Sequence, residues 1–334
     1  MTPVPPERYP SSDADVAPFV RSLGLDGLLD LHVHVMPDRI QAAVWSFFDA
    51  LDDPPWPVTY RAPEPDRRRT LAGLGVARHT ALAYAHRPGV AAWLNEHTLA
   101  LADEDDQVVP SFTFYPEDGV EGYVDEALAR GGVVAKVHLQ VGRFSATDPL
   151  LDPVWRSLVG ARTPVVLHAS AVYGVEGGHE YCGADVVRDL LDRHPDLVLV
   201  VAHLGAPDID DFLDLADEVP TLRFDTAMVL TDPPFGPLTG RFTDEHHARI
   251  RAIAERLVWG SDFPTIPLPY AALLRGLAVL ELDDAGLRWL LHDHADQLLT
   301  RVRTPGSTGP SGGWSGAPPA VRTPAPRPDR ADDR

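Results

Sequence analysis

Short runs of apolar, strand-forming residues recur along the chain, and a longer stretch with helical periodicity follows most of them. The run GVVAKVHLQ is typical of the first kind, and VAAWLNEHTLALADE, with apolar residues three and four positions apart, is typical of the second. Eight runs begin at Gly27, Ala77, Val108, Gly132, Pro164, Leu197, Leu222 and Arg256. Strands that alternate with helices indicate parallel βαβ units, and eight such units close a barrel. The pattern therefore predicts an α/β fold, a (β/α)8 TIM barrel.

The two ends of the chain do not share this pattern. Residues 303–334 are dominated by Pro, Gly, Ser, Ala and charge, which bury too little apolar surface to offset the entropy of ordering them. We expect a flexible segment at 1–20, the barrel at 21–302 and a disordered tail at 303–334. Two Pro-rich stretches, Asp52–Asp66 and Thr231–Glu245, follow the first and seventh strands and predict loops at the barrel mouth.

The charge of the chain narrows the classes of partner. Lys and Arg number 29 against 49 Asp and Glu, a formal net charge of −20, which argues against nucleic acid and anionic membranes. No run of 18 apolar residues predicts a membrane span, and the first residues do not resemble a secretory signal. Cys182 is the single cysteine, which excludes an internal disulfide. These features favour a cytoplasmic protein with a small-molecule substrate.

Polar side chains interrupt the apolar runs near their ends. They are Asp30, His32 and His34 in the first run, Lys136 and His138 in the fourth, His168 in the fifth, His203 in the sixth and Asp262 in the eighth. Residues two apart on a strand share a face, and the carboxyl ends of barrel strands meet at one mouth. We therefore expect these side chains to converge there, with Asp30 deeper on the face that carries His32 and His34.

Imidazoles that converge with a carboxylate are typical of a divalent metal site. Such a set suits Zn²⁺, with Mn²⁺ or Fe²⁺ as alternatives. It leaves a position for water, whose pKa the cation lowers towards neutrality. Without a metal, each buried ring would need a hydrogen-bond partner or cost about 1–3 kcal/mol. The sequence therefore predicts a metal cofactor at the barrel mouth.

The ordered set of D-L-H-V-H, His168, His203 and S-D-F-P resembles the amidohydrolase superfamily. Within it, the chain is most similar to the amidohydrolase-related family that includes aminocarboxymuconate-semialdehyde decarboxylase. The resemblance spans the whole expected barrel, from Gly27 to Leu299, and is specific because four motifs occur in order at barrel spacing. One departure is His294, where the family often has Asn before an alanine.

The resemblance implies roles for individual residues. The implied metal ligands are His32, His34, His168 and Asp262. Asp262 would also carry a proton from the water to the leaving group. His203 would hydrogen-bond the water or polarise the substrate, and Asp30 would orient the imidazoles of the first motif.

Lys136 leaves two interpretations open. Binuclear members of the superfamily carry a carboxylated lysine on the fourth strand, where it bridges two metals. We favour one ion over two, with Lys136 as a catalytic cation that contacts the substrate or the ligands.

Three functions remain in view. The first is a metal-dependent hydrolase in which activated water attacks a carbonyl, amide, lactone or ester carbon. The second is non-oxidative decarboxylation of an unsaturated or aromatic carboxylate, and the third is a metal-binding barrel without catalysis. Lys136 favours hydrolysis, because the decarboxylases of the family generally lack a lysine there. The resemblance also implies a homodimer.

Several residues have a simpler structural interpretation beside the functional one. Asp262 precedes a proline and a helix, so it could cap that helix instead of binding metal. His138 fits an inward pocket group and a packed ring equally well. Arg61 and Arg143 are hypotheses for a carboxylate anchor. The Gly-rich loop Ala171–Gly183, with Tyr173 and Cys182, predicts a mobile loop or a pocket wall.

Overall fold

The computed structural model describes residues 2–52, 55–231 and 242–302, and it confirms the predicted barrel. All strands are parallel, in the orders β1-β2-β3 and β4-β5-β6-β7-β8-β9. Their bounds are β1 Leu28–Asp30, β2 Val76–Thr80, β3 Val108–Val109, β4 Ser111–Thr113, β5 Val134–His138, β6 Val165–His168, β7 Leu199–Val201, β8 Arg223–Asp225 and β9 Leu257–Val258. Each predicted run overlaps a strand.

Two features turn the two sheets into one ring. Pro110 lies between β3 and β4, and because it lacks an N–H it divides the third barrel strand in two. On the other side, β1 meets β9: the Leu31 N–H donates to the Trp259 carbonyl at 3.0 Å, and Val33 forms a parallel bridge with Phe263. The first and last strands therefore close the barrel.

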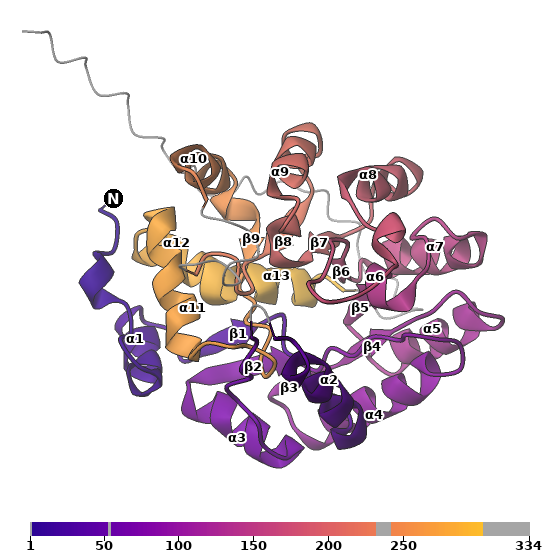
Figure 1. Cartoon of the computed structure of the whole chain (residues 1–334), viewed down its shortest axis with the longest axis horizontal. Helices are drawn as coiled ribbons and strands as arrows, with labels where there is room; N and C mark the ends of the chain where they lie inside the picture. The colour runs from indigo at the N-terminus through magenta and orange to yellow at the C-terminus, as the bar shows by residue number, and fades with distance from the viewer. Residues whose placement is uncertain (1, 53–54, 232–241, 303–334) are drawn as a thin grey trace, which may run out of the picture.

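Helices surround the strands as an outer ring (Figure 1). Their bounds are α1 Val16–Ser22, α2 Asp38–Asp49, α3 Glu64–Gly73, α4 Ala91–Glu104, α5 Val120–Ala129, α6 Leu139–Gly142, α7 Asp152–Ala161, α8 Ala184–Arg193, α9 Ile209–Glu218, α10 Asp244–Ala252, α11 Tyr270–Gly276, α12 Asp284–Arg288 and α13 His294–Thr300. The pattern that predicted them is visible in α8, which buries Val187, Leu190 and Leu191 at helical spacing. None of the helices in the described ranges has the length and apolarity needed to cross a membrane.

The barrel interior has an apolar floor. Its buried side chains come from the strands and from α13, which lies within the ring of outer helices (Figure 1). They include Leu29, Val109, Val134, Val166, Val200, Val258, Ala295 and Leu298. Because this end is filled, the polar residues further along β1, β5 and β6 occupy the opposite, carboxyl end of the barrel.

The N-terminal residues differ from the flexible segment expected at 1–20. Val4 and Tyr9 are buried, the Val4 N–H donates to the Leu282 carbonyl at 2.8 Å, and Tyr9 packs on Phe19 with ring centroids 5.4 Å apart. The overall composition of this segment is polar, but these two apolar side chains anchor it to the barrel. The tail expected at 303–334 lies outside the described residues.

The two Pro-rich stretches have different outcomes. In the stretch Asp52–Asp66, Trp56 is buried and its Nε1–H donates to the Thr265 carbonyl at 2.8 Å, while Glu64 already begins α3. This loop therefore packs against the segment that follows β9. Most of the stretch Thr231–Glu245 lies outside the described residues.

Acid is expected to destabilise the fold through His294. Its ring is buried, donates from Nδ1 to the Leu257 carbonyl at 2.8 Å and stacks on Trp289. Burial lowers the pKa of His294 to about 4 from an ordinary value of 6.5. The unfolded chain therefore takes up a proton that the folded chain does not, so this stability is full above pH 6.5 and is lost as the pH falls towards 4. The loss reaches about 1 kcal/mol at about pH 5.5.

The variant His294→Asn tests this expectation, because its amide can place an N–H where Nδ1 of the imidazole stands but does not titrate. Urea unfolding of both proteins at neutral pH and near pH 5.5 gives the two losses of stability. We expect a smaller acid loss in the variant. Equal losses would show that His294 does not carry the effect.

Candidate metal centre

Three predicted ligands meet at the carboxyl end of the barrel. His34 Nε2 lies 3.0 Å from Asp262 Oδ1, and His32 Nε2 lies 3.6 Å from the same oxygen. The two Nε2 atoms are 3.2 Å apart. His32 and His34 follow β1, and Asp262 follows β9, so the closure of the ring brings them together.

The opposite side of each imidazole is held by an acceptor. His32 Nδ1 lies 2.7 Å from Asp225 Oδ2, and His34 Nδ1 lies 2.9 Å from the Leu82 carbonyl. A carbonyl accepts only, so Nδ1 of His34 carries a proton, and the ionised Asp225 places one on Nδ1 of His32. Both Nε2 atoms therefore carry the lone pair and point into the cluster. In many metal sites the ligating imidazole is oriented in the same way, by a hydrogen bond from its other ring nitrogen.

The cluster fits a divalent cation. Burial, followed by the charge of Lys136, lowers the pKa of His32 to about 4 against the opposing effect of Asp225, so this ring is neutral at pH 7. The lone pairs of neutral imidazoles and a carboxylate repel one another at these separations unless a positive charge lies among them. Two nitrogens and an oxygen are ligands that Zn²⁺ and Mn²⁺ accept. The residues present therefore suit the predicted metal.

His168, the fourth predicted ligand, lies beside this group. Its ring stacks on His138 with centroids 3.9 Å apart, and it meets His203 edge-on at 4.9 Å. Burial, with the neighbouring His138 ring, lowers the pKa of His168 well below its ordinary value. Within the described part of the chain, its buried Nε2 has no hydrogen-bond partner. A buried nitrogen left in this state costs about 1–3 kcal/mol, which a bound ligand would recover.

His203 stands on a strained turn at the end of β7. His203 and Leu204 have φ of +56° and +53°, in the left-handed region that residues other than glycine rarely adopt. The His203 Nδ1 donates to the Ala227 carbonyl at 3.0 Å. Backbone strain of this kind is concentrated at functional sites.

Asp225 at the end of β8 was missed from the sequence. It is fully buried, and besides His32 it accepts the backbone N–H groups of His203 at 2.8 Å and Ala227 at 3.1 Å. Burial alone would raise the pKa of Asp225, but the His32 ring and the hydrogen bonds lower it to about 2. The sequence feature that could have indicated Asp225 is an acidic residue inside the apolar run LRFDTAMVL. A search that looks only for histidines misses this residue.

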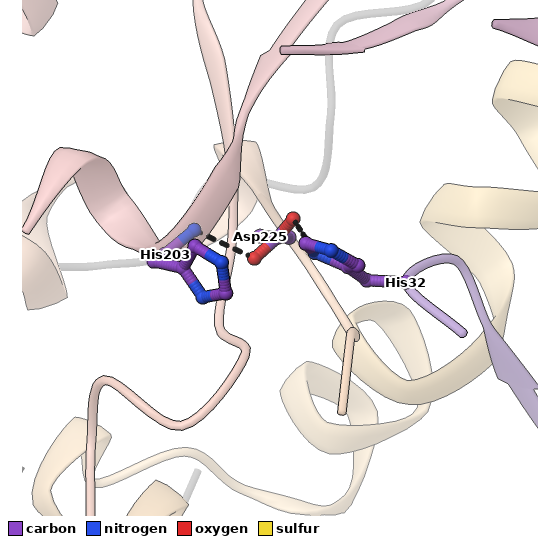
Figure 2. A group of neighbouring side chains, drawn as sticks. All are labelled: His32, His203 and Asp225. Carbon is purple, nitrogen blue, oxygen red and sulfur yellow. Dashed lines mark hydrogen bonds and ion pairs between the residues drawn. The ribbon is translucent and has the colours of Figure 1, made fainter. Parts of the chain in front are cut away.

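A second group of potential ligands, His32, His203 and Asp225, has a different character (Figure 2). Both oxygens of Asp225 already accept hydrogen bonds, and the nitrogen of His32 on this side is one of the donors. This group is therefore a hydrogen-bond network behind the first cluster.

The prediction for Asp30 is wrong in its geometry. Leu29 joins the inner apolar cluster, and Asp30 lies on the other side of β1, where its carboxylate accepts the N–H groups of His32 and Ser261 and the hydroxyl of Tyr270. Burial raises the pKa of Asp30 to about 7. Side chains stop alternating between the two faces where β1 ends, so Asp30 accepts hydrogen bonds from backbone N–H groups rather than from an imidazole. The carboxylate that does contact an imidazole, as was expected of Asp30, is Asp225.

Lys136 lies where the sequence predicted it. It is 1% exposed, and its Nζ is 3.2 Å from His32 Nε2. Burial lowers the pKa of Lys136 to about 8, although Asp225 and Asp262 favour its charged form. A buried ammonium thus borders the metal cluster directly.

Asp262 does not cap a helix. The next helix, α11, begins only at Tyr270, and Asp262 itself has φ of +66°. Its N–H donates to the His32 carbonyl at 2.8 Å, which ties the turn to β1. Burial would raise the pKa of Asp262, but its contact with His34 and the surrounding rings lower it, so the carboxylate is ionised. The alternative of a capping residue is therefore wrong.

A cavity of about 240 Å³ opens onto the cluster. Three of the predicted residues form its polar part: His168, His203 and Asp262. Its apolar wall includes Phe48, Trp56, Val172, Tyr173, Pro207 and Met228. Among the described residues, no lysine or arginine lines it. The site therefore combines a few polar groups with an apolar chamber, as small-molecule sites do.

The two arginines considered as carboxylate anchors lie elsewhere. Arg61 pairs with Asp49, and Arg143 donates to the Glu176 carbonyl at 2.8 Å. Neither contributes to the cavity wall.

The loop Ala171–Gly183 forms part of the pocket wall, one of the two alternatives left open. Val172 and Tyr173 line the cavity, and the Val172 N–H donates to the Gln140 side chain at 2.5 Å. Burial raises the pKa of Cys182 to about 12, so its thiol is not a nucleophile at neutral pH.

The sequence model of a family described as Amidohydrolase matches residues 29–301. No curated protein matches the chain. Solved structures share the fold at low identity. An uncharacterised TIM-barrel protein from Bordetella bronchiseptica is 16% identical, with a TM-score of 0.63 over 82% of this chain and 99% of its own.

Two decarboxylases are also similar in fold. The 5-carboxyvanillate decarboxylase from Sphingomonas paucimobilis is 15% identical, with a TM-score of 0.57 over 82% of this chain and 99% of its own. The dihydroxybenzoic acid decarboxylase from Polaromonas sp. JS666, solved with manganese and 2-nitroresorcinol, is 14% identical, with a TM-score of 0.60 over 83% and 97%. These likenesses show the fold, and the family match over most of its length shows that the chain belongs to the amidohydrolase family.

Proposed function

We propose that the chain is a metal-dependent hydrolase that acts on an uncharged ester, lactone or amide of a small molecule. The observation that carries this proposal is the cavity, whose described wall is apolar and ends on His168, His203 and Asp262. Its volume of about 240 Å³ lies below the roughly 300–1,000 Å³ of sites for drug-sized ligands, which favours a small substrate.

His32, His34 and Asp262 would hold the metal, and His168 would complete the set through its buried Nε2, which has no hydrogen-bond partner among the described residues. A bound divalent cation polarises a carbonyl oxygen and lowers the pKa of a water molecule towards neutrality. Zn²⁺ is the preferred ion because imidazoles dominate the set, with Mn²⁺ or Fe²⁺ as alternatives.

The protein residues supply the remaining steps. Asp262 is ionised and borders the cavity, so it accepts the proton of the attacking water and returns it to the leaving atom. The Nδ1 proton of His203 is donated to the Ala227 carbonyl, so Nε2 of the neutral ring, at the same wall, accepts a hydrogen bond from the attacking water and orients it. Lys136 does not line the cavity; its buried ammonium lies 3.2 Å from His32 Nε2 and would act through the cluster, where it offsets the negative charge that develops nearby.

One tightly bound ion per chain is expected on elemental analysis of the purified protein. Lys136 Nζ is 3.2 Å from His32 Nε2, so an ammonium occupies the neighbourhood that a second cation would need. Two tightly bound ions would overturn this preference and favour the alternative of a carboxylated Lys136 that bridges them.

Decarboxylation is the second candidate, and the lysine itself favours it in one respect, since a buried cation attracts a carboxylate. Against it, an anionic substrate would meet an apolar wall without arginine among the described residues.

A screen of lactones, esters, amides and aromatic acids, followed by turnover in ¹⁸O-water, separates the two reactions. We expect ¹⁸O in the product carboxylic acid, because the water oxygen stays on the carbonyl carbon; release of CO₂ without label would establish decarboxylation, and no turnover with metal bound would favour a barrel without catalysis.

A further inference from the structure

We propose that Asp225 is a positioning residue whose single carboxylate sets both the tautomer of His32 and the turn that carries His203. The inference rests on the metal site of the proposed function but not on the reaction that occurs there. It assigns a role to a residue outside the predicted ligand set. Figure 2 shows the carboxylate between the two histidines.

The first step concerns the tautomer. Asp225 Oδ1 accepts the N–H groups of His203 and Ala227, which stabilises the carboxylate as an anion. Oδ2 therefore accepts as well, and the proton in its 2.7 Å contact belongs to His32 Nδ1. The lone pair of His32 is then on Nε2, the atom that faces His34 and Asp262. An imidazole in the other tautomer would present a proton to the metal instead.

The second step concerns His203. Two hydrogen bonds from one short segment at the end of β8 hold this residue: Asp225 Oδ1 accepts its backbone N–H, and the Ala227 carbonyl accepts from its ring Nδ1. The left-handed backbone of His203, with φ of +56°, is unfavourable in isolation, so these contacts maintain it. The same carboxylate thereby fixes the direction in which the His203 side chain points at the wall of the cavity.

Substitution by asparagine changes these two functions differently. In Asp225→Asn, the amide oxygen can keep the two backbone N–H groups, which leaves the NH₂ group facing His32 Nδ1. That nitrogen then has to accept, and the ring proton moves to Nε2. Metal binding would have to displace it, and loss of such a partner typically weakens metal binding by about 10–100-fold.

Asp30 provides a matched control. It is also fully buried and also accepts three hydrogen bonds, from the backbone of His32 and Ser261 and from the Tyr270 hydroxyl. It contacts backbone where Asp225 contacts a ring, so Asp30→Asn should lower the melting temperature without moving the proton on His32.

The test uses the full chain, labelled with ¹⁵N-histidine and freed of metal with a chelator. The chain has 14 histidines, and the signals of His32 are those absent from His32→Gln. We expect His32 to be protonated on Nδ1 in the wild type and in Asp30→Asn, and on Nε2 in Asp225→Asn. Zn²⁺ titration should give a Kd raised about 10–100-fold in Asp225→Asn alone.

The wild-type spectrum decides the case even if Asp225→Asn fails to fold. A wild-type His32 protonated on Nε2 would overturn the proposal. An unchanged tautomer and unchanged Zn²⁺ affinity in a folded Asp225→Asn would do the same. Because the spectrum is recorded without metal or substrate, a failure of the hydrolase proposal would leave this result intact.

Discussion

Replacement of Asp262 by asparagine is expected to slow turnover by at least about 10²-fold and up to about 10⁴-fold while the barrel stays folded. The side chain is ionised and lies 3.0 Å from His34 Nε2, at the polar end of the cavity. An amide keeps an oxygen for the metal but cannot take a proton from water. The measurement is kcat for the two proteins after Zn²⁺ reconstitution, with metal content determined on the same samples.

Asp49→Asn is the control for loss of charge alone, since this carboxylate is exposed on α2 and pairs with Arg61. It should keep the wild-type rate. Wild-type turnover by a metal-loaded Asp262→Asn protein would remove Asp262 as the proton carrier.

Removal of metal is expected to lower the melting temperature by roughly 10 °C. Free metal at about 1,000 times its Kd adds about 4 kcal/mol to the stability of the folded state. For a domain of this size, each kcal/mol corresponds to about 2–4 °C. The cause is specific to this cluster, because neutral imidazoles and a carboxylate within 3.6 Å lose their mutual repulsion when a cation binds. Thermal scans with Zn²⁺ and with chelator measure the difference.

Two histidine variants locate the effect. His34→Gln removes a predicted ligand and should abolish the metal-dependent rise. His79→Gln removes a ring of similar burial on β2, whose Nδ1 donates to the Thr80 carbonyl away from the cluster, and should keep the rise. A rise that survives in His34→Gln would place the metal elsewhere.

Periodicity was enough to predict the barrel, because each strand carries a run of residues that must be buried on both faces. It also predicted that His32, His34 and Asp262 would come together, since they stand at strand ends and parallel strands end together. What it missed depends on local backbone geometry. The alternation of faces stops after β1, so Asp30 turned to Tyr270 instead of the cavity.

Asp225 and His203 illustrate a second limit. The strand that precedes His203 ends at Val201, and the left-handed turn that aims the ring has no signature in the pattern of apolar residues. Asp225 became recognisable only once the end of β8 lay beside β7 and its carboxylate met the His32 ring in space. A partner that comes from 193 positions away in the chain is a property of the tertiary structure.

The packing of the N-terminal residues has a consequence for synthesis. Arg8 pairs with Asp284 at 2.6 Å, the Val4 N–H reaches Leu282, and the Ala271 N–H donates to Asp13. These partners emerge from the ribosome only after β1 to β8 have been made, as does β9, the neighbour of β1. The nascent polypeptide therefore leaves one side of its first strand and its leading apolar side chains without their final contacts until β9 and α12 have been made, a period in which a chaperone could protect them.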